Sequence, residues 1–263
     1  MTMAKRILLF LCFITAFFVI NNWARSSLSH NETFRNGATL LMIILVILID
    51  RFTQSSLNRI LYTKCDPETY IKRLCRILNG IVEKRSPARA NVRRLELCNG
   101  LFAAGRYDEM ETELQKITVF PERTAALCRF YYLQLHFHNH IRKHELQYAA
   151  DLLDTLRAKP LVTRLKPAMT ASMKQGLTGM SYALRMAQGN DEGAEEYYLS
   201  FMHGNTYSRV TAQLHLGRIC QRRGETDKAR AAYQYVVTYG NKLHIVRLAA
   251  DALTTLDSAS PSV

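Results

Sequence analysis

The stretch from Val210 to Asn241 constrains the fold of this chain more than any other part of the sequence. Gly224 lies in its middle, and glycine readily takes the left-handed conformation that ends a helix. We therefore expect one helix before Gly224 and a second helix after it. The small residues Gly217 and Ala229 would let the two backbones approach, and Tyr233 would fill the seam between them. The stretch predicts an antiparallel helix pair.

The same skeleton, a glycine followed by two apolar residues at fixed spacing, recurs upstream. The further copies are Gly189 with Ala194 and Tyr198, and Gly105 with Met110 and Leu114. Ala149 and Leu153 could mark another second helix, although no turn glycine precedes them. A constant spacing favours a repeated helix pair. A generic helical bundle, in which glycine only ends helices, is the alternative.

The last copy resembles the tetratricopeptide repeat, whose pattern is W-x₂-L-G-x₂-Y…A-x₃-F…P. The matching residues are Leu216, Gly217, Cys220, Gly224, Ala229 and Tyr233. Gln213 stands where the pattern has Trp. The resemblance covers a repeat domain at residues 91–257, followed by a tail at 258–263. It implies an all-α solenoid of paired helices, whose concave face holds a peptide or a partner protein.

Two apolar segments precede this domain, within a membrane-anchor region at residues 1–62. The first, about residues 7–23, follows Lys5 and Arg6, and the second occupies about residues 37–52. The first is near the lower limit of length for a transmembrane helix, and the uncharged part of the second, Ala38 to Ile49, has only 12 residues. Because a short polar segment separates the two, we expect two transmembrane helices that form a hairpin. A buried core helix is the alternative for the second segment. A cleaved signal peptide is the alternative for the first segment.

The formal net charge is +13, and many of the bases follow the second apolar segment. Bases at both ends of a hairpin favour both ends in the cytoplasm. This predicts a two-pass protein of the cell membrane, with the repeat domain facing the cytoplasm. Residues 63–90 are expected to form a basic linker helix. The bases expected near anionic lipids are Arg51, Arg59, Lys64, Lys72, Arg73 and Arg76. An ordinary solvated helix face is the alternative.

Few residues suggest bound cofactors or catalysis. The six cysteines contain no CxxC pair, and the sequence has no glycine-rich phosphate loop, G-x-S-x-G or HExxH motif. The histidines at 136, 140 and 144 would share one helix face, but only Glu145 lies near them as a carboxylate. We therefore expect no metal, no cofactor and no enzyme activity. Nucleic acid is not expected either, because no aromatic residues alternate with the bases.

These observations favour a membrane-anchored scaffold or adaptor that binds a protein or peptide through its concave face. The candidate partner-binding residues are Arg218, Gln221, Arg222, Thr211, Asn99 and Met186. Arg218 and Arg222 lie one helical turn apart, so they could hold a carboxylate of an incoming peptide. A peptide-sensing regulator, or an enzyme without a recognisable motif, remains the alternative.

Overall fold

The computed structural model describes residues 40, 44, 48, 51–81, 86–158 and 167–259. The chain divides into two compact units, Met1–Ser56 and Leu57–Val263. Every element within the described residues is a helix, which confirms the all-α prediction. The predicted spans at 7–23 and 37–52 lie outside the described residues, apart from positions 40, 44, 48, 51 and 52. None of the described helices combines the length and the apolar character that crossing a membrane requires.

The unit from Leu57 begins with a group of helices that contains the predicted basic linker. Its elements are the π-helix η1 (Arg59–Thr63), α3 (Pro67–Asn79), α4 (Pro87–Ala104) and α5 (Tyr107–Gln115). Asp66 caps α3, because its Oδ1 accepts a hydrogen bond of 3.1 Å from the backbone N–H of Thr69. Tyr70 and Leu74 of α3 are buried in the core of this unit. Residues 67–79 are thus a packed helix of the same unit.

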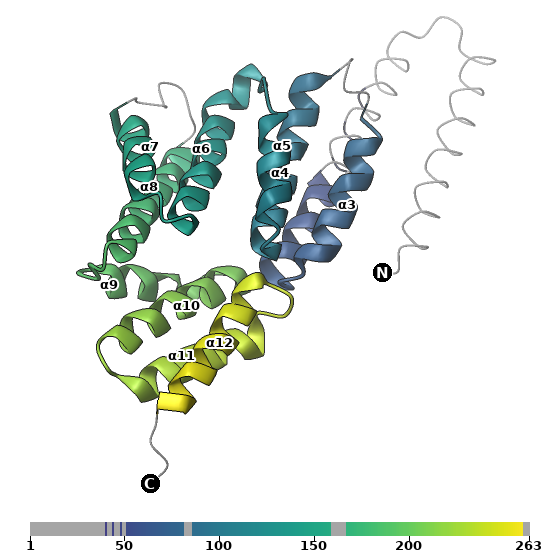
Figure 1. The fold of residues 1–263 in the computed structure, drawn as a ribbon. Coiled ribbons are helices and arrows are strands. Elements are labelled where there is room, and N and C mark those ends of the chain that lie inside the picture. Colours follow the sequence, from purple (N-terminus) through teal and green to yellow (C-terminus); the bar gives the residue numbers. More distant parts are fainter. Residues whose placement is uncertain are drawn as a thin grey trace, which may run out of the picture. The chain divides into compact units, whose positions relative to one another are not determined.

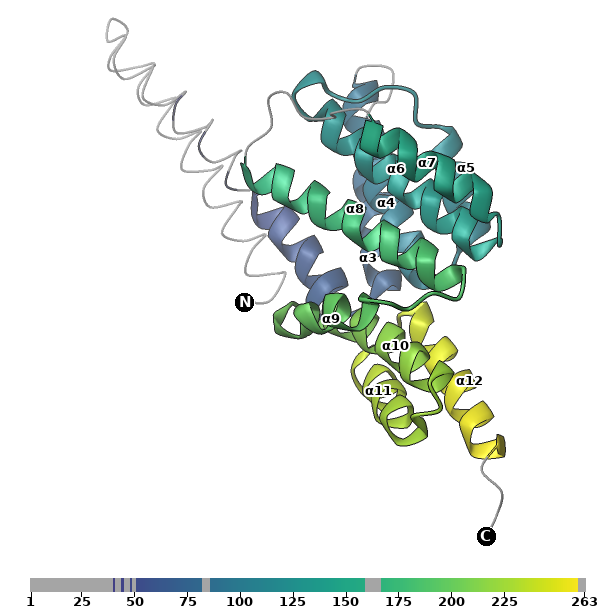
Figure 2. The same ribbon diagram turned by 90° about the vertical axis from the view of Figure 1, so that its left-hand side faces the viewer.

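Two further groups of helices follow in the sequence (Figure 1). The middle group consists of the 3₁₀ helix η2 (Glu122–Thr124), α6 (Ala125–Arg142), α7 (Leu146–Ala158) and α8 (Pro167–Ala187). The last group consists of α9 (Ala194–Leu199), the 3₁₀ helix η3 (Ser200–His203), α10 (Thr206–Arg222), α11 (Thr226–Tyr239) and α12 (His244–Ala259). The short helix α9 lies between α8 and α10 and contacts both (Figure 2).

Four of the turns between paired helices have the same geometry. Gly105, His144, Gly189 and Gly224 each have a positive φ, between 60° and 87°. At each turn, this residue and the next donate backbone hydrogen bonds back into the preceding helix, in the pattern of a Schellman motif. The residues five and nine positions further on are buried in every case: Met110 and Leu114, Ala149 and Leu153, Ala194 and Tyr198, and Ala229 and Tyr233. Three of these turns were predicted, and the histidine turn was not.

The largest hydrophobic core joins the first and last groups of helices. It contains residues from Leu57 to Leu135 and from Val210 to Leu256, whereas α6, α7 and α8 share a second cluster. The loop before α12 is tied to the start of the unit. Asn241 Nδ2 donates a hydrogen bond of 2.8 Å to the carbonyl oxygen of Lys64. The backbone N–H of Lys242 donates a hydrogen bond of 3.2 Å to the carbonyl oxygen of Cys65. Helices that are far apart in the sequence therefore contact one another, whereas in a one-dimensional array each repeat contacts only its neighbours.

Candidate partner-binding site

Three of the six candidate residues make side-chain hydrogen bonds inside the protein, and two of these three lie at the end of α10. Arg222 binds the carboxylate of Asp191 through Nε, at 2.9 Å, and through Nη2. Its Nη1 also donates to the carbonyl oxygen of Met186 at 3.2 Å. The Oε1 of Gln221 accepts a hydrogen bond of 2.7 Å from the hydroxyl of Tyr233. Arg222 therefore fastens the end of α10 to the loop between α8 and α9, and Gln221 fastens α10 to α11.

Arg218 has a different environment, one turn earlier on α10. It is solvent-exposed and makes no hydrogen bond or ion pair with the part of the chain that the structure describes. Its pKa is nevertheless lowered, first because the surrounding protein displaces water that would stabilise the charge. The hydroxyls of Tyr233, Tyr198 and Tyr107 act in the opposite direction, while the like charge of Arg222 lowers the pKa further. Arg218 is accessible, but it is surrounded by several helices.

The other three candidates are partly or fully enclosed. Met186 is only 7% exposed and belongs to the cluster beneath α9. Asn99 is half-buried, and its Nδ2 donates to the hydroxyl of Tyr62 at 2.9 Å. Thr211 is half-buried on α10. Of the six candidates, Arg218 alone is both exposed and without a polar partner within the described residues.

Two arginines that the sequence did not single out act, like Arg218, on the hydroxyl of Tyr107. The guanidinium carbon of Arg142, on α6, is 4.4 Å from the centroid of the Tyr107 ring. The same guanidinium group donates to Oδ1 of Asn139 through Nε at 3.2 Å and Nη2 at 3.1 Å. On α12, Nη2 of Arg247 is 3.5 Å from Nδ1 of His244. We call Arg142, Arg218, Arg247 and Tyr107 the arginine site.

The electrostatics of Tyr107 indicate that the three arginines converge. Burial raises the pKa of the Tyr107 hydroxyl. Three positive charges act to lower it, namely those of Arg142, Arg247 and Arg218. Arg142 lies over the Tyr107 ring, and Arg247 lies beside His244, whose ring is 5.5 Å from that of Tyr107. Two of the guanidinium groups are therefore next to Tyr107, and Arg218 acts on its hydroxyl electrostatically. Opposite charge on a ligand would be favoured at this place.

Two largely enclosed histidines lie close to the arginine site. The ring of His215 stacks on Tyr198, with 4.4 Å between centroids, and the ring of His138 is 5.8 Å from that of Phe102. Burial lowers the pKa of His138 to about 4. Burial also lowers the pKa of His215 to about 3, and the positive charge of Arg218 acts in the same direction. Both histidines are therefore neutral at neutral pH.

The predicted face of three histidines on one helix does not form. His136 and His140 lie on α6, but this helix ends at Arg142, and His144 is the turn residue with a φ of 60°. Instead, Nδ1 of His140 is 2.5 Å from Oε2 of Glu145. No group of three or more metal-ligating side chains occurs within residues 51–81, 86–158 and 167–259.

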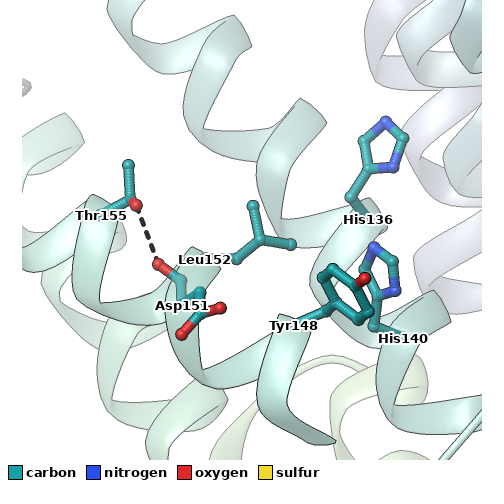
Figure 3. A pocket seen from close by; sticks show the side chains of 6 residues that line it. All are labelled: His136, His140, Tyr148, Asp151, Leu152 and Thr155. Carbon is teal, nitrogen blue, oxygen red and sulfur yellow. Dashed lines mark hydrogen bonds between the residues drawn. The ribbon is translucent and has the colours of Figure 1, made fainter. Parts of the chain in front are cut away.

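A small pocket lies between α6 and α7, with a volume of about 240 Å³. Its lining residues are His136, His140, Tyr148, Asp151, Leu152 and Thr155 (Figure 3). The rings of His140 and Tyr148 stack with 5.6 Å between their centroids. Nε2 of His136 is buried without a hydrogen-bond partner in the described chain. Asp151 already accepts a hydrogen bond of 3.0 Å from Nε2 of Gln147. The pocket therefore offers few polar groups that remain unsatisfied.

The predicted membrane-proximal bases are all on the protein surface. The exposed residues are Arg51, Arg59, Lys64, Lys72, Arg73 and Arg76. On α3 the bases alternate with the buried side chains, so that Lys72 and Arg76 point to solvent while Tyr70 and Leu74 enter the core. This arrangement leaves the outer face of α3 positively charged.

Comparison with protein-family models, with curated proteins and with solved structures found no match to this chain.

Proposed function

We propose that this chain is a binding protein, in which the helical unit holds a protein or peptide partner at the membrane. The four matching helix turns, each followed by two buried residues at fixed spacing, support an architecture like that of tetratricopeptide repeats. In such proteins one face of the paired helices is left for a partner. This architecture supports a scaffold or adaptor role.

One observation carries the proposal. Arg218 is exposed and makes no polar contact within the described residues, although helices approach it from several sides. Holding a charged group in a setting that weakens its hydration costs stability unless something compensates for it. A partner that supplies hydrogen bonds to this guanidinium group would provide that compensation.

The apolar segments of the N-terminal region support attachment to the cell membrane as a two-pass protein, with the helical unit in the cytoplasm. The exposed bases Lys72 and Arg76 on α3 would then gain from anionic lipids, by about 1 kcal/mol for each base near the surface. Lipid would be a second, less specific partner.

The test is affinity capture with the full chain from detergent-solubilised membranes. Arg218→Ala should capture less of the partner than the wild-type chain, by about tenfold in affinity if one charged hydrogen-bonded contact is lost. Because Arg218 has no polar contact in the described chain and its hydration is weakened there, this change should leave the unfolding temperature of the unbound protein unchanged or raise it.

Arg129 provides the matched control. It is exposed on α6 and also makes no hydrogen bond or ion pair with the described residues. Arg129→Ala removes the same charge and should leave capture intact. Capture by folded Arg218→Ala that equals capture by Arg129→Ala would refute the proposal.

A further inference from the structure

The arginine site concentrates positive charge from separate parts of the chain at one place. Arg142, Arg218 and Arg247 lie on α6, α10 and α12, and all three act on the hydroxyl of Tyr107. These three arginines are solvent-exposed. Arg142 and Arg247 also both act on His244. Positive charges gathered around the same two rings are unfavourable unless negative charge offsets them.

Carboxylates of the protein offset this positive charge only in part. Within the described chain, Arg142, Arg218 and Arg247 form no ion pair with a carboxylate. Among the carboxylates of neighbouring elements, Glu111 acts electrostatically on Arg142. Asp191 binds Arg222, and Glu111 binds Lys143 and Asn139. Asp251 lies one turn after Arg247 and acts electrostatically on His244, without an ion pair to Arg247.

The site is also held in place by its neighbours. The Tyr107 ring packs edge-on against Phe102 and His244, with centroid distances of 5.7 and 5.5 Å. Arg142 lies over the face of that ring and is fixed by two hydrogen bonds to Asn139. A ligand would therefore meet donors that are already positioned, which lowers the entropy lost on binding.

We propose that the arginine site binds several neighbouring carboxylates of an acidic peptide segment. This inference rests on the proposed function and names the chemistry of its partner. Guanidinium groups pair with carboxylates through two parallel hydrogen bonds, and the hydroxyl of Tyr107 can donate a further one. Since the three arginines come from three helices, the site suits a run of acidic side chains better than one isolated carboxylate.

The experiment measures binding of end-blocked hexaglutamate to the purified full chain in detergent, with hexaglutamine as the uncharged control. Hexaglutamate should bind, and its affinity should fall as salt is raised. Hexaglutamine should not bind measurably. Arg218→Ala should weaken hexaglutamate binding about tenfold, which is the effect expected for losing a hydrogen-bonded charge pair. Arg247→Ala should act in the same direction.

The matched control is Arg129→Ala, which removes an equal charge about 20 Å along α6 from Arg142. It should change the affinity less than twofold. Absence of hexaglutamate binding to the folded wild-type chain would overturn the inference, as would equal weakening by Arg129→Ala and Arg218→Ala. Either result would exclude an acidic peptide as the ligand of the arginine site. Capture of a membrane partner through Arg218 is tested by the separate affinity-capture experiment, so the two proposals can fail independently.

Discussion

At the scale of single residues, two arginines on neighbouring turns of α10 have opposite roles. Arg222 is bound to Asp191 and to the carbonyl oxygen of Met186, so it stabilises the packing of α10 on the loop before α9. Arg218 is exposed and has no such partner in the described chain. Both residues carry the same charge and lie on the same helix, so the sequence does not distinguish them. Tertiary packing alone makes Arg222 a structural residue and leaves Arg218 available to a ligand.

His144 provides a prediction about backbone strain. It occupies the left-handed position, φ 60°, that glycine occupies in the three matching turns. A side chain in this region is strained, whereas glycine is not. The left-handed conformation costs a side chain about 1–2 kcal/mol, and the extra chain entropy of glycine offsets part of this gain. His144→Gly should therefore stabilise the protein by about 1 kcal/mol, measured by denaturant unfolding. Lys143→Gly, at a φ of −80°, is the control and should not stabilise. A loss of stability in His144→Gly as large as in the control would contradict this explanation.

His138 and His215 predict a loss of stability in mild acid. Their folded-state pKa values, about 4 and about 3, lie below the unfolded value near 6.5. The unfolded chain therefore binds more protons once the pH falls below 6.5, and stability falls with it. When the pH is lowered from 7 to 5, each histidine should lower the free energy of unfolding by about 2 kcal/mol.

His215→Gln isolates one of these contributions. The positive charges of Arg218 and Arg222 act on His215, so protonation there is also opposed by repulsion. The variant is expected to lose about 2 kcal/mol less than the wild-type chain over the same pH range. Denaturant titrations at pH 7 and pH 5 measure the difference. Equal losses in the two proteins would show that His215 takes up its proton in the folded state.

At the scale of elements, helix pairs were predictable because their turns depend on local chemistry. Gly105, Gly189 and Gly224 marked three turns, since glycine is favoured where φ is positive. The helix starts at Pro67 and Pro87 were predictable for a similar reason, because proline fits the first turn of a helix. The turn at His144 was missed, since histidine gives no such local signal.

The close packing between paired helices predicts that larger side chains there will lower the stability of the protein. Ala194 and Ala229 are fully buried at the same position after their turns. Ala194→Leu and Ala229→Leu should each destabilise the protein by about 1–3 kcal/mol through overpacking. As controls, Glu192→Leu and Lys228→Leu change exposed residues and should stay within about 0.5 kcal/mol. Thermal unfolding measures all four, and small, equal effects would exclude a shared register for the two pairs.

At the scale of the whole molecule, long-range packing explains what the sequence left open. Arg142 and Arg247 are far apart in the chain, and neither lies in a motif. Arg142 reaches Tyr107 because α6 packs on α4, and Arg247 does so because the last helices pack on the first ones, through a core shared by residues such as Leu74 and Val236. Such contacts depend on the tertiary fold, so neither the arginine site nor the closure of the unit could be predicted from local patterns.

The predicted topology can be tested on intact cells. The bases on either side of the two apolar segments predict that the helical unit lies in the cytoplasm. Protease added outside intact cells or spheroplasts should therefore leave residues 57–263 undigested, and permeabilised cells serve as the control. Digestion from outside would reverse the orientation. A mature N-terminus near Ser26 would show instead that the first segment is a cleaved signal peptide.

Site-specific photo-cross-linking in native membranes tests most directly whether a partner is held at the arginine site. A photoreactive residue in place of Asp251 would sit one turn from Arg247 without removing an arginine, and one in place of Gln234 would sit on the exposed face of α11. We expect a cross-linked partner from position 251, lost on adding Arg218→Ala, and none from position 234. Cross-linking that is equal at both positions, or that persists at position 251 in the folded Arg218→Ala chain, would contradict a partner bound at this site.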